Sequence, residues 1–304
     1  MSDIQLDVES TFGDEEPESR TLFKDAWLDL RSSKVFWISA FLLVIVLTMV
    51  FFPGLVADDS KTSSLTGGCI LSNSLQPPGG EYFLGTDQQG CDVYALSVYG
   101  ARPSVSVGVI AAIGTTLIGA FLGLMAGFYG GKTDSILSRI FDIFLGVPYI
   151  IGAIVLLSAI DLPGIWGVTL ALTLLSWPVA ARMVRGKVIE AKGQDYTLAA
   201  RALGATNGRI MLRHILPNAI GPSIVVAVIS LGLFIGAEAT LSYLGLGIRP
   251  PAFSWGTMIA AAQNTFFQAP WTLFVPAGML TIAVLAFVLL GEAVSDALDP
   301  KLRK

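Results

Sequence analysis

Few side chains in this sequence have the types and spacing that catalysis needs. The 304 residues include one histidine, His214, and two cysteines, Cys69 and Cys91. They contain no zinc-ligand spacing, no phosphate-binding loop and no nucleophile elbow. We therefore expect that the chain is not an enzyme and does not hydrolyse ATP itself. We also expect that it holds no metal ion or cofactor and binds no nucleic acid.

The composition is that of a membrane protein. Hydrophobic residues make up 53% of the chain and charged residues 14%, against roughly 25% charged residues in a soluble domain. Long apolar runs, each able to cross the hydrocarbon core of a bilayer, predict an all-α integral membrane protein. The six predicted transmembrane helices are residues 35–56, 104–129, 143–160, 165–181, 218–245 and 271–291.

The lysines and arginines orient these helices. With the N-terminus inside, 16 of the 19 basic residues fall on the cytoplasmic side, and only Lys61, Arg102 and Arg249 fall outside. This positive-inside bias predicts that both termini are cytoplasmic. Residues 1–34 form an acidic N-terminal tail of disordered composition. Within it, residues 23–30 form either a short amphipathic helix on the membrane surface or a loosely ordered lead-in.

The same orientation places both cysteines outside. Cys69 and Cys91 lie in the polar segment 58–103, on the side of the membrane where disulfides persist. We expect them to pair and to close a loop; two free thiols are the alternative.

Three features of the apolar segments concern packing or a pathway. Gly119, Gly123 and Gly127 recur every fourth residue, so they share one helix face and permit close helix contact. Arg139 and Asp142 lie within one helical turn and are placed to pair. Glu238 lies inside a predicted span, where an acidic group costs about 2.5–3.5 kcal/mol. It is either a residue that lines or gates a translocation path, or a structural carboxyl bonded to a neighbouring helix or a partner subunit.

One long polar, basic stretch, residues 189–222, interrupts the apolar chain and must lie at the membrane surface. It predicts two short helices. Asp195 is the expected N-cap of the first, and Gly204 its left-handed C-terminal cap. The second begins near Asn207 and is expected to end before Pro217. Small residues on one patch (Ala199, Ala200 and Gly204) suit close approach by another protein; a loop lying on lipid headgroups is the alternative reading.

The spacing within this insert resembles a known family. Two alanines are followed by a glycine four residues later, and then by nine residues and a His-x-Leu-Pro-Asn sequence. This pattern resembles the cytoplasmic coupling loop in permease subunits of ATP-binding-cassette (ABC) importers, most closely those of the dipeptide, oligopeptide and nickel family. The matching residues are Tyr196, Ala199, Ala200, Gly204, His214, Pro217 and Asn218. Leu198 departs from the pattern, because the family usually has an acidic residue there.

Three further stretches resemble the same family, in the same order. They are residues 83–104, 241–256 and 296–300, so the resemblance covers about residues 81–304. Cys91 stands where the family usually has arginine, which fits recruitment of this position for a disulfide.

The resemblance implies a C-type permease of peptide importers, with the type I ABC importer permease fold, in a bacterial cytoplasmic membrane. It divides the chain into a tail (1–34), a first transmembrane helix (35–57), an extracytoplasmic segment (58–103) and a five-helix permease domain (104–304) with its coupling loop at 182–217. The coupling residues that it implies are Tyr196, Ala199, Ala200, Arg201, Gly204, His214, Pro217 and Asn218.

The implied partners are a second homologous permease, two ABC ATPase domains that bind ATP and Mg²⁺, an extracytoplasmic substrate-binding protein and membrane lipid. The implied cargo is a di- or oligopeptide. Nickel chelates, glutathione or haem are alternatives within the same architecture. A stand-alone secondary transporter or a structural membrane anchor is an alternative of another class.

Overall fold

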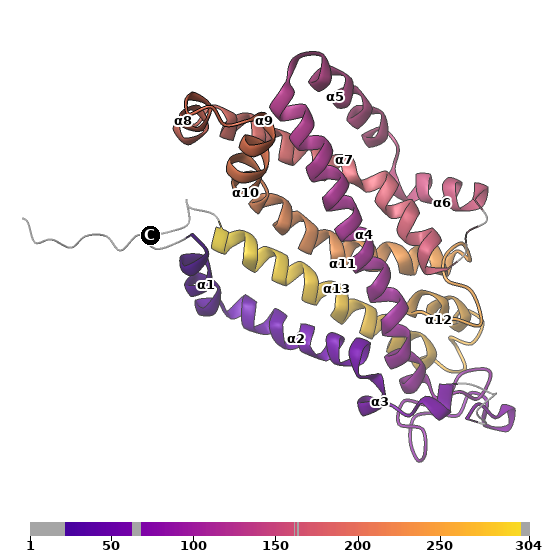
Figure 1. Cartoon of the computed structure of the whole chain (residues 1–304). Coiled ribbons are helices and arrows are strands. Elements are labelled where there is room, and N and C mark those ends of the chain that lie inside the picture. Colours follow the sequence, from indigo (N-terminus) through magenta and orange to yellow (C-terminus); the bar gives the residue numbers. More distant parts are fainter. Residues whose placement is uncertain (1–21, 63–67, 161, 163, 299–304) are drawn as a thin grey trace, which may run out of the picture.

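The computed structural model describes residues 22–62, 68–160, 162 and 164–298. The acidic residues at positions 3–18 of the N-terminal tail and the family-like end at 299–300 therefore lie outside the described part. Figure 1 shows a helical bundle. Its helices are α1 (Leu22–Ser32), α2 (Lys34–Phe51), α3 (Pro53–Val56), α4 (Val93–Tyr129), α5 (Gly131–Leu145), α6 (Tyr149–Ala159), α7 (Ile165–Lys192), α8 (Asp195–Ala202), α9 (Asn207–Arg209), the π-helix η4 (Ile210–Ile215), α10 (Leu216–Ala219), α11 (Gly221–Tyr243), α12 (Trp255–Ala262) and α13 (Trp271–Leu298).

Five of these helices are long and apolar enough to cross a membrane, namely α2, α4, α7, α11 and α13. The count reaches six if the pair α5 and α6, which is bent by 85°, forms one broken span. The prediction of an all-α membrane fold is therefore confirmed. Two short 3₁₀ turns, η1 (Asp59–Thr62) and η3 (Leu71–Asn73), and two isolated bridges complete the described secondary structure.

The third predicted span, 143–160, is wrong as one continuous helix. The chain breaks after α5, and α6 has only 11 residues, about 16 Å of helix, which is too short for a bilayer core of roughly 30 Å. Pro148 explains the break, because a proline disfavours the helical conformation of the residue before it, here Val147.

Two other predicted transmembrane helices are shorter than the helices in the structure. Helix α4 begins at Val93 rather than at residue 104, and Pro103 lies inside it. Residues 97 and 104, on either side of this proline, are fixed by Trp255 of α12. Its indole Nε1 donates to the Ser97 carbonyl (2.8 Å) and its backbone N–H to Ser104 Oγ (3.3 Å). Helix α7 likewise runs past residue 181 to Lys192, so the polar insert continues directly from a transmembrane helix.

The predicted glycine face lies in the contact between α4 and α7. A Cβ atom on Gly119 would lie 2.6 Å from Ala180 Cβ, and one on Gly127 2.8 Å from Val188 Cβ. Such distances are far below ordinary carbon contacts of about 3.5–4.0 Å. The two helices therefore approach as closely as they do because these positions carry no side chain.

The two ends of the bundle differ. The insert (α8–α10), α1 and the end of α13 gather at one end, and α3, α12 and the segment before α4 gather at the other (Figure 1). In the latter segment Cys69 and Cys91 form a disulfide, and Trp271 Nε1 of α13 donates to the Thr86 carbonyl (3.1 Å). The segment is thus fastened both to itself and to the helices beneath it.

Candidate functional site

The insert begins at α8, immediately after α7. Asp195 was expected as its N-cap, but Gln194 is the cap and Asp195 is the first helical residue. A carboxylate in the first turn is favourable there, because the N-terminus of a helix carries partial positive charge.

Gly204 ends α8 in the predicted left-handed conformation, with φ of 80°. The backbone N–H of Gly204 donates to the Arg201 carbonyl and that of Ala205 to the Ala200 carbonyl, each at 3.0 Å. These two bonds form a Schellman motif, which fixes the direction of the chain after the helix. A Cβ atom at Gly204 would meet nothing within 4 Å, so this side of the turn is open.

The second half of the insert differs from the prediction. The helix does not end before Pro217: α9 passes into the π-helix η4 and then into α10, which contains Pro217 near its start. A proline is tolerated in the first turn of a helix, where its missing N–H is not needed. The Asn218 side-chain amide donates to the His214 carbonyl (2.7 Å) across this junction.

The family-like residues of the insert divide between two faces. Ala200 is buried with Ile210 and Ile215 against Val184 and Val188 of α7. The small-residue patch is therefore not one exposed surface, because Ala200 belongs to the interior while its neighbours face outward. The exposed members are Tyr196, Ala199, Arg201, Gly204, Pro217 and Asn218, and His214 is half-buried.

Sequence reasoning missed the largest apolar contribution to this outer face. Leu203 is 89% exposed and Leu198 49% exposed. The sequence carried a signal for this apolar face. Leu198 and Leu203 both lie in the stretch that was interpreted only for its small residues, and Leu198 is also the residue that departs from the family pattern. The outer face of α8 consequently carries an apolar side chain in its middle and another at its C-terminal end, with a glycine turn beside it.

The C-terminal part of α7, which is the stem of the insert, is bonded to α5 and α4. Asp142 of α5 pairs with Arg182 of α7 (2.6 Å) rather than with its sequence neighbour Arg139, so that prediction is wrong. The side chain of Asp142 is directed at α7, and a partner on another helix outcompetes one on its own. Lys192, at the end of α7, donates to the carbonyl of Phe128 in α4 (2.6 Å).

Glu238 lies in α11, five residues before its C-terminal end at Tyr243, and is fully buried. The Ser242 hydroxyl donates to its Oε1 (2.7 Å) and accepts from the Ile248 backbone N–H (3.0 Å). The side chains of Ser104 and Ser254 also approach the carboxyl, while Oε2 has no partner among the described residues. The carboxyl thus occupies the junction of α4, α11 and α12, inside this chain's own bundle.

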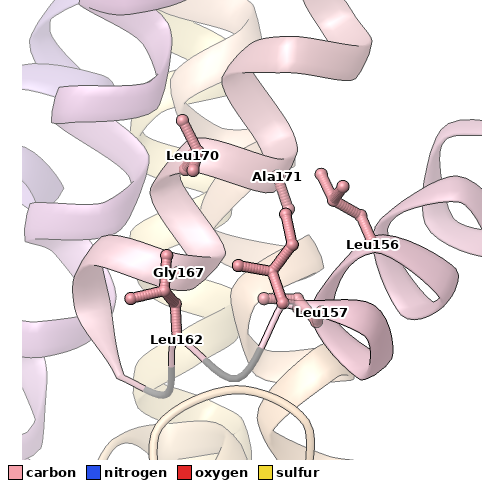
Figure 2. Close-up of a pocket in the computed structure, with 7 residues that line it drawn as sticks. Leu156, Leu157, Leu162, Gly167, Leu170 and Ala171 are labelled. Atoms are coloured by element: carbon pink, nitrogen blue, oxygen red, sulfur yellow. The ribbon is translucent and has the colours of Figure 1, made fainter.

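A small cavity lies between α6 and the start of α7 (Figure 2). Its volume is about 10 Å³, room for one water molecule at most. The lining is wholly apolar and consists of Leu156, Leu157, Ile160, Leu162, Gly167, Leu170 and Ala171. It is too small for a peptide or a metal chelate, so it is not a cargo site.

Two family models match the chain. Residues 119–304 match the binding-protein-dependent transport system inner membrane component, and residues 21–78 match the N-terminal transmembrane domain of oligopeptide transport permease C. The chain belongs to this permease family. It is a multi-pass protein of the bacterial inner membrane. The family resemblance that the insert indicated is confirmed.

Curated relatives match the permease over nearly its whole length. It is 39% identical over 288 residues to the oligopeptide transport system permease protein OppC of Bacillus subtilis (strain 168), covering 94% of this chain and 92% of that one. It is 36% identical over 281 residues to the dipeptide transport system permease protein DppC of Alkalihalophilus pseudofirmus, covering 92% and 90%.

A solved structure shares the fold of the permease. The MetNI methionine ABC transporter in inward-facing conformations matches with a TM-score of 0.54 at 24% identity, over 67% of this chain and 96% of that one. At this identity the match shows the fold alone, and the type I ABC importer permease fold expected from the sequence is confirmed.

Proposed function

We propose that this permease is one of two membrane subunits of an ATP-driven importer of di- or oligopeptides. Its relatives are oligopeptide and dipeptide transport permeases, which supports a peptide cargo. The observation that carries the mechanism is the build of α8, which has a buried face anchored on α7 and an open outer face that ends in a Schellman turn.

The outer face of α8 suits a surface groove on an ATPase subunit. Tyr196, Leu198 and Leu203 supply exposed apolar area, and Gly204 lets a partner backbone approach. The inner face carries Thr197, whose hydroxyl donates to the Ala191 carbonyl at the end of α7 (2.8 Å). A push on the outer face is therefore delivered to α7 rather than absorbed by a loose loop.

The partners follow from this arrangement. Two ATPase domains bind ATP and Mg²⁺ in the cytoplasm, and closure on ATP displaces the coupling helix of each permease. The two permeases then rock from an inward-facing to an outward-facing state, and a binding protein releases peptide into the cavity between them. The permease itself is not the ATPase. Cytoplasmic termini are part of this proposal, and the position of α1 and of the end of α13 at the same end of the bundle as the insert supports them (Figure 1).

Glu238 serves structure rather than gating in this proposal. Its carboxyl is fully buried and bonded to Ser242 within α11, so it faces protein and not an open pathway. This position avoids the cost of exposing an acidic group to lipid.

Two alternatives remain distinguishable. The same architecture importing nickel chelates, glutathione or haem differs only in cargo, because the family-like motifs lie in coupling and packing regions. A stand-alone secondary transporter would use buried charges as ion or proton relays. Among the described residues of the spans, Glu238 is the buried acidic residue and forms no ion pair, which favours the ATP-driven reading.

The test is uptake by a deletion strain complemented with the wild-type permease or with Gly204→Asp. The panel contains labelled dipeptide, a longer peptide, glutathione and nickel. We expect the wild type to restore peptide uptake alone. We expect Gly204→Asp to reach the membrane in normal amount and to restore none, because a charged side chain then occupies the open side of the turn and the left-handed φ is strained.

The matched control is Gly193→Asp. Gly193 is also exposed and also follows a helix, here α7, but its φ of −88° suits any residue. This control should transport normally. Gly204→Asn separates the two causes in the test variant, since asparagine tolerates the left-handed conformation yet still adds a side chain. Normal uptake with Gly204→Asp would refute the coupling role, and restoration of nickel or glutathione uptake alone would refute the cargo.

A further inference from the structure

A two-pronged ion pair joins the stem of the insert to α5. Arg185 of α7 donates through Nε to Asp134 Oδ1 and through Nη2 to Asp134 Oδ2, the second bond measuring 2.6 Å. Ser138, one turn further along α5, donates to the same Oδ1 (3.2 Å). The paired side chains are only 30% and 21% exposed. Bidentate, partly desolvated pairs of this kind hold geometry better than surface pairs do.

A second pair joins the same two helices but faces solvent. Arg182 and Asp142 bond at 2.6 Å, with side chains 56% and 59% exposed. As α5 advances from Asp134 to Asp142, its partner on α7 moves back from Arg185 to Arg182, so the helices run antiparallel. Beyond the second pair, towards the start of α7, the ring of Trp177 lies 5.4 Å from each of the Phe141 and Phe144 rings. Helix α5 is thus fastened to α7 along one face.

Helix α5 leads directly into the break before α6. The residues there, Gly146, Val147 and Pro148, are exposed in the isolated chain. Irregular backbone at membrane depth is tolerated only where protein or water covers it, not lipid. Taken as one broken span, the bent pair therefore faces either the second permease or the aqueous path. Helix α5 is the element that connects this surface with the stem of the coupling insert.

We propose that Asp134 and Arg185 are positioning residues for transport, which make α5, and with it the α5–α6 break, move with the stem of the coupling insert. This inference rests on the proposed coupling function of α8. The pair touches neither cargo nor nucleotide. Its role is to convert a displacement of α7 at the cytoplasmic end into a displacement of the bent element at membrane depth.

The experiment uses the whole complex, with both permeases, the ATPases and the binding protein, reconstituted in vesicles. The variants are Asp134→Arg, Arg185→Asp and the double exchange, with Asp134→Asn as a milder change. The control pair is Asp142→Arg and Arg182→Asp. The readouts are the amount of assembled complex and the number of peptides imported per ATP hydrolysed.

We expect each single reversal at 134 or 185 to lower the peptide-to-ATP ratio by at least about fivefold, the lower end of the range for coupled sites. The double exchange should restore most of it, and Asp134→Asn should lie between. The control reversals should change the ratio by less than about twofold, because exposed ion pairs contribute little.

Other outcomes overturn the inference. A reduced amount of assembled complex with an unchanged peptide-to-ATP ratio would show that the pair only stabilises the fold. If the reversals at both ion pairs lowered the peptide-to-ATP ratio equally, the loss would come from the change in surface charge and not from the Asp134–Arg185 pair. If Gly204→Asp uncouples transport while Asp134→Arg does not, the coupling function stands and the role of the ion pair fails. If neither variant uncouples, the coupling function fails with it.

Discussion

Replacing Gly123 of α4 by alanine should force α4 and α7 apart. The new Cβ atom would lie 2.9 Å from Val184 Cβ and 3.1 Å from the backbone nitrogen of Arg185, and closer still to the Ala181 carbonyl oxygen. Two of these three atoms are backbone atoms of α7, which no rotamer change can move aside. Helix α7 must therefore withdraw by most of an ångström to reach ordinary contact distances.

Two opposing effects determine the magnitude. Overpacking of a tight contact costs about 1–3 kcal/mol, whereas alanine stabilises a helix by roughly 1 kcal/mol relative to glycine. The net effect on the free energy of unfolding should be a loss of up to about 2 kcal/mol. Gly186 of α7 is the matched control, because its Cβ would meet nothing within 4 Å. Gly186→Ala should show the helix effect alone, a gain of up to about 1 kcal/mol.

The assay is reversible unfolding of the purified permease in mixed micelles, with helix content followed as denaturing detergent is added. The quantity of interest is the difference between the two variants, which removes the propensity effect and leaves the cost of the α4–α7 contact. If Gly123→Ala is as stable as Gly186→Ala, the close approach of these helices contributes nothing, and our account of the glycine face is refuted.

Two further predictions concern the segment before α4. A membrane-impermeant maleimide should label Cys69 and Cys91 only after reduction; labelling without reductant would contradict the disulfide. The double variant with serine at both positions should lose about 3 kcal/mol of stability, the loop-closure contribution for a sequence separation of 22. Burial raises the pKa of Asp87 above 3.8, although backbone N–H groups, that of Cys91 first, donate to its carboxyl and oppose the shift. An acid with a raised pKa binds its proton more tightly in the folded state, so stability should fall as pH rises from 3.8 through that raised pKa. The Asp87→Asn variant keeps the Oδ1 acceptor but does not titrate, so it should flatten the pH dependence of stability. Hydrogen exchange in residues 71–92, followed as a function of pH, measures this; an unchanged profile would contradict the prediction.

Local patterns predicted most of the elements. The long apolar runs predicted all five spanning helices, and Gly204 predicted the left-handed end of α8, which the structure shows with φ of 80°. The spacing of Gly119, Gly123 and Gly127 predicted a close helix contact, although not with which helix. These successes share a cause: apolar length, helical period and glycine conformation depend on a residue and its near neighbours alone.

The errors in helix boundaries have an equally physical origin. The second span was expected to begin after Pro103, and a helix was expected to end before Pro217, but in both cases the helix includes the proline. Tertiary hydrogen bonds from Trp255 fix residues on both sides of the first proline, and a preceding π-helix accommodates the second. At Pro148 no such support occurs in the described residues, and the chain bends by 85°.

What the sequence by itself determined is the class of the protein: a helical membrane permease whose polar insert carries the family's coupling pattern. Only the tertiary structure decided which groups meet. In the structure Asp142 pairs with Arg182 rather than with Arg139, and Asp134 pairs with Arg185, 51 residues away in the sequence. Ala200 is buried, whereas the turn at Gly204 is open. The reason is that a span's composition reports only that it enters the membrane, while the choice of partner depends on how helices rotate and tilt against one another. That rotation is set by contacts between residues far apart in the chain.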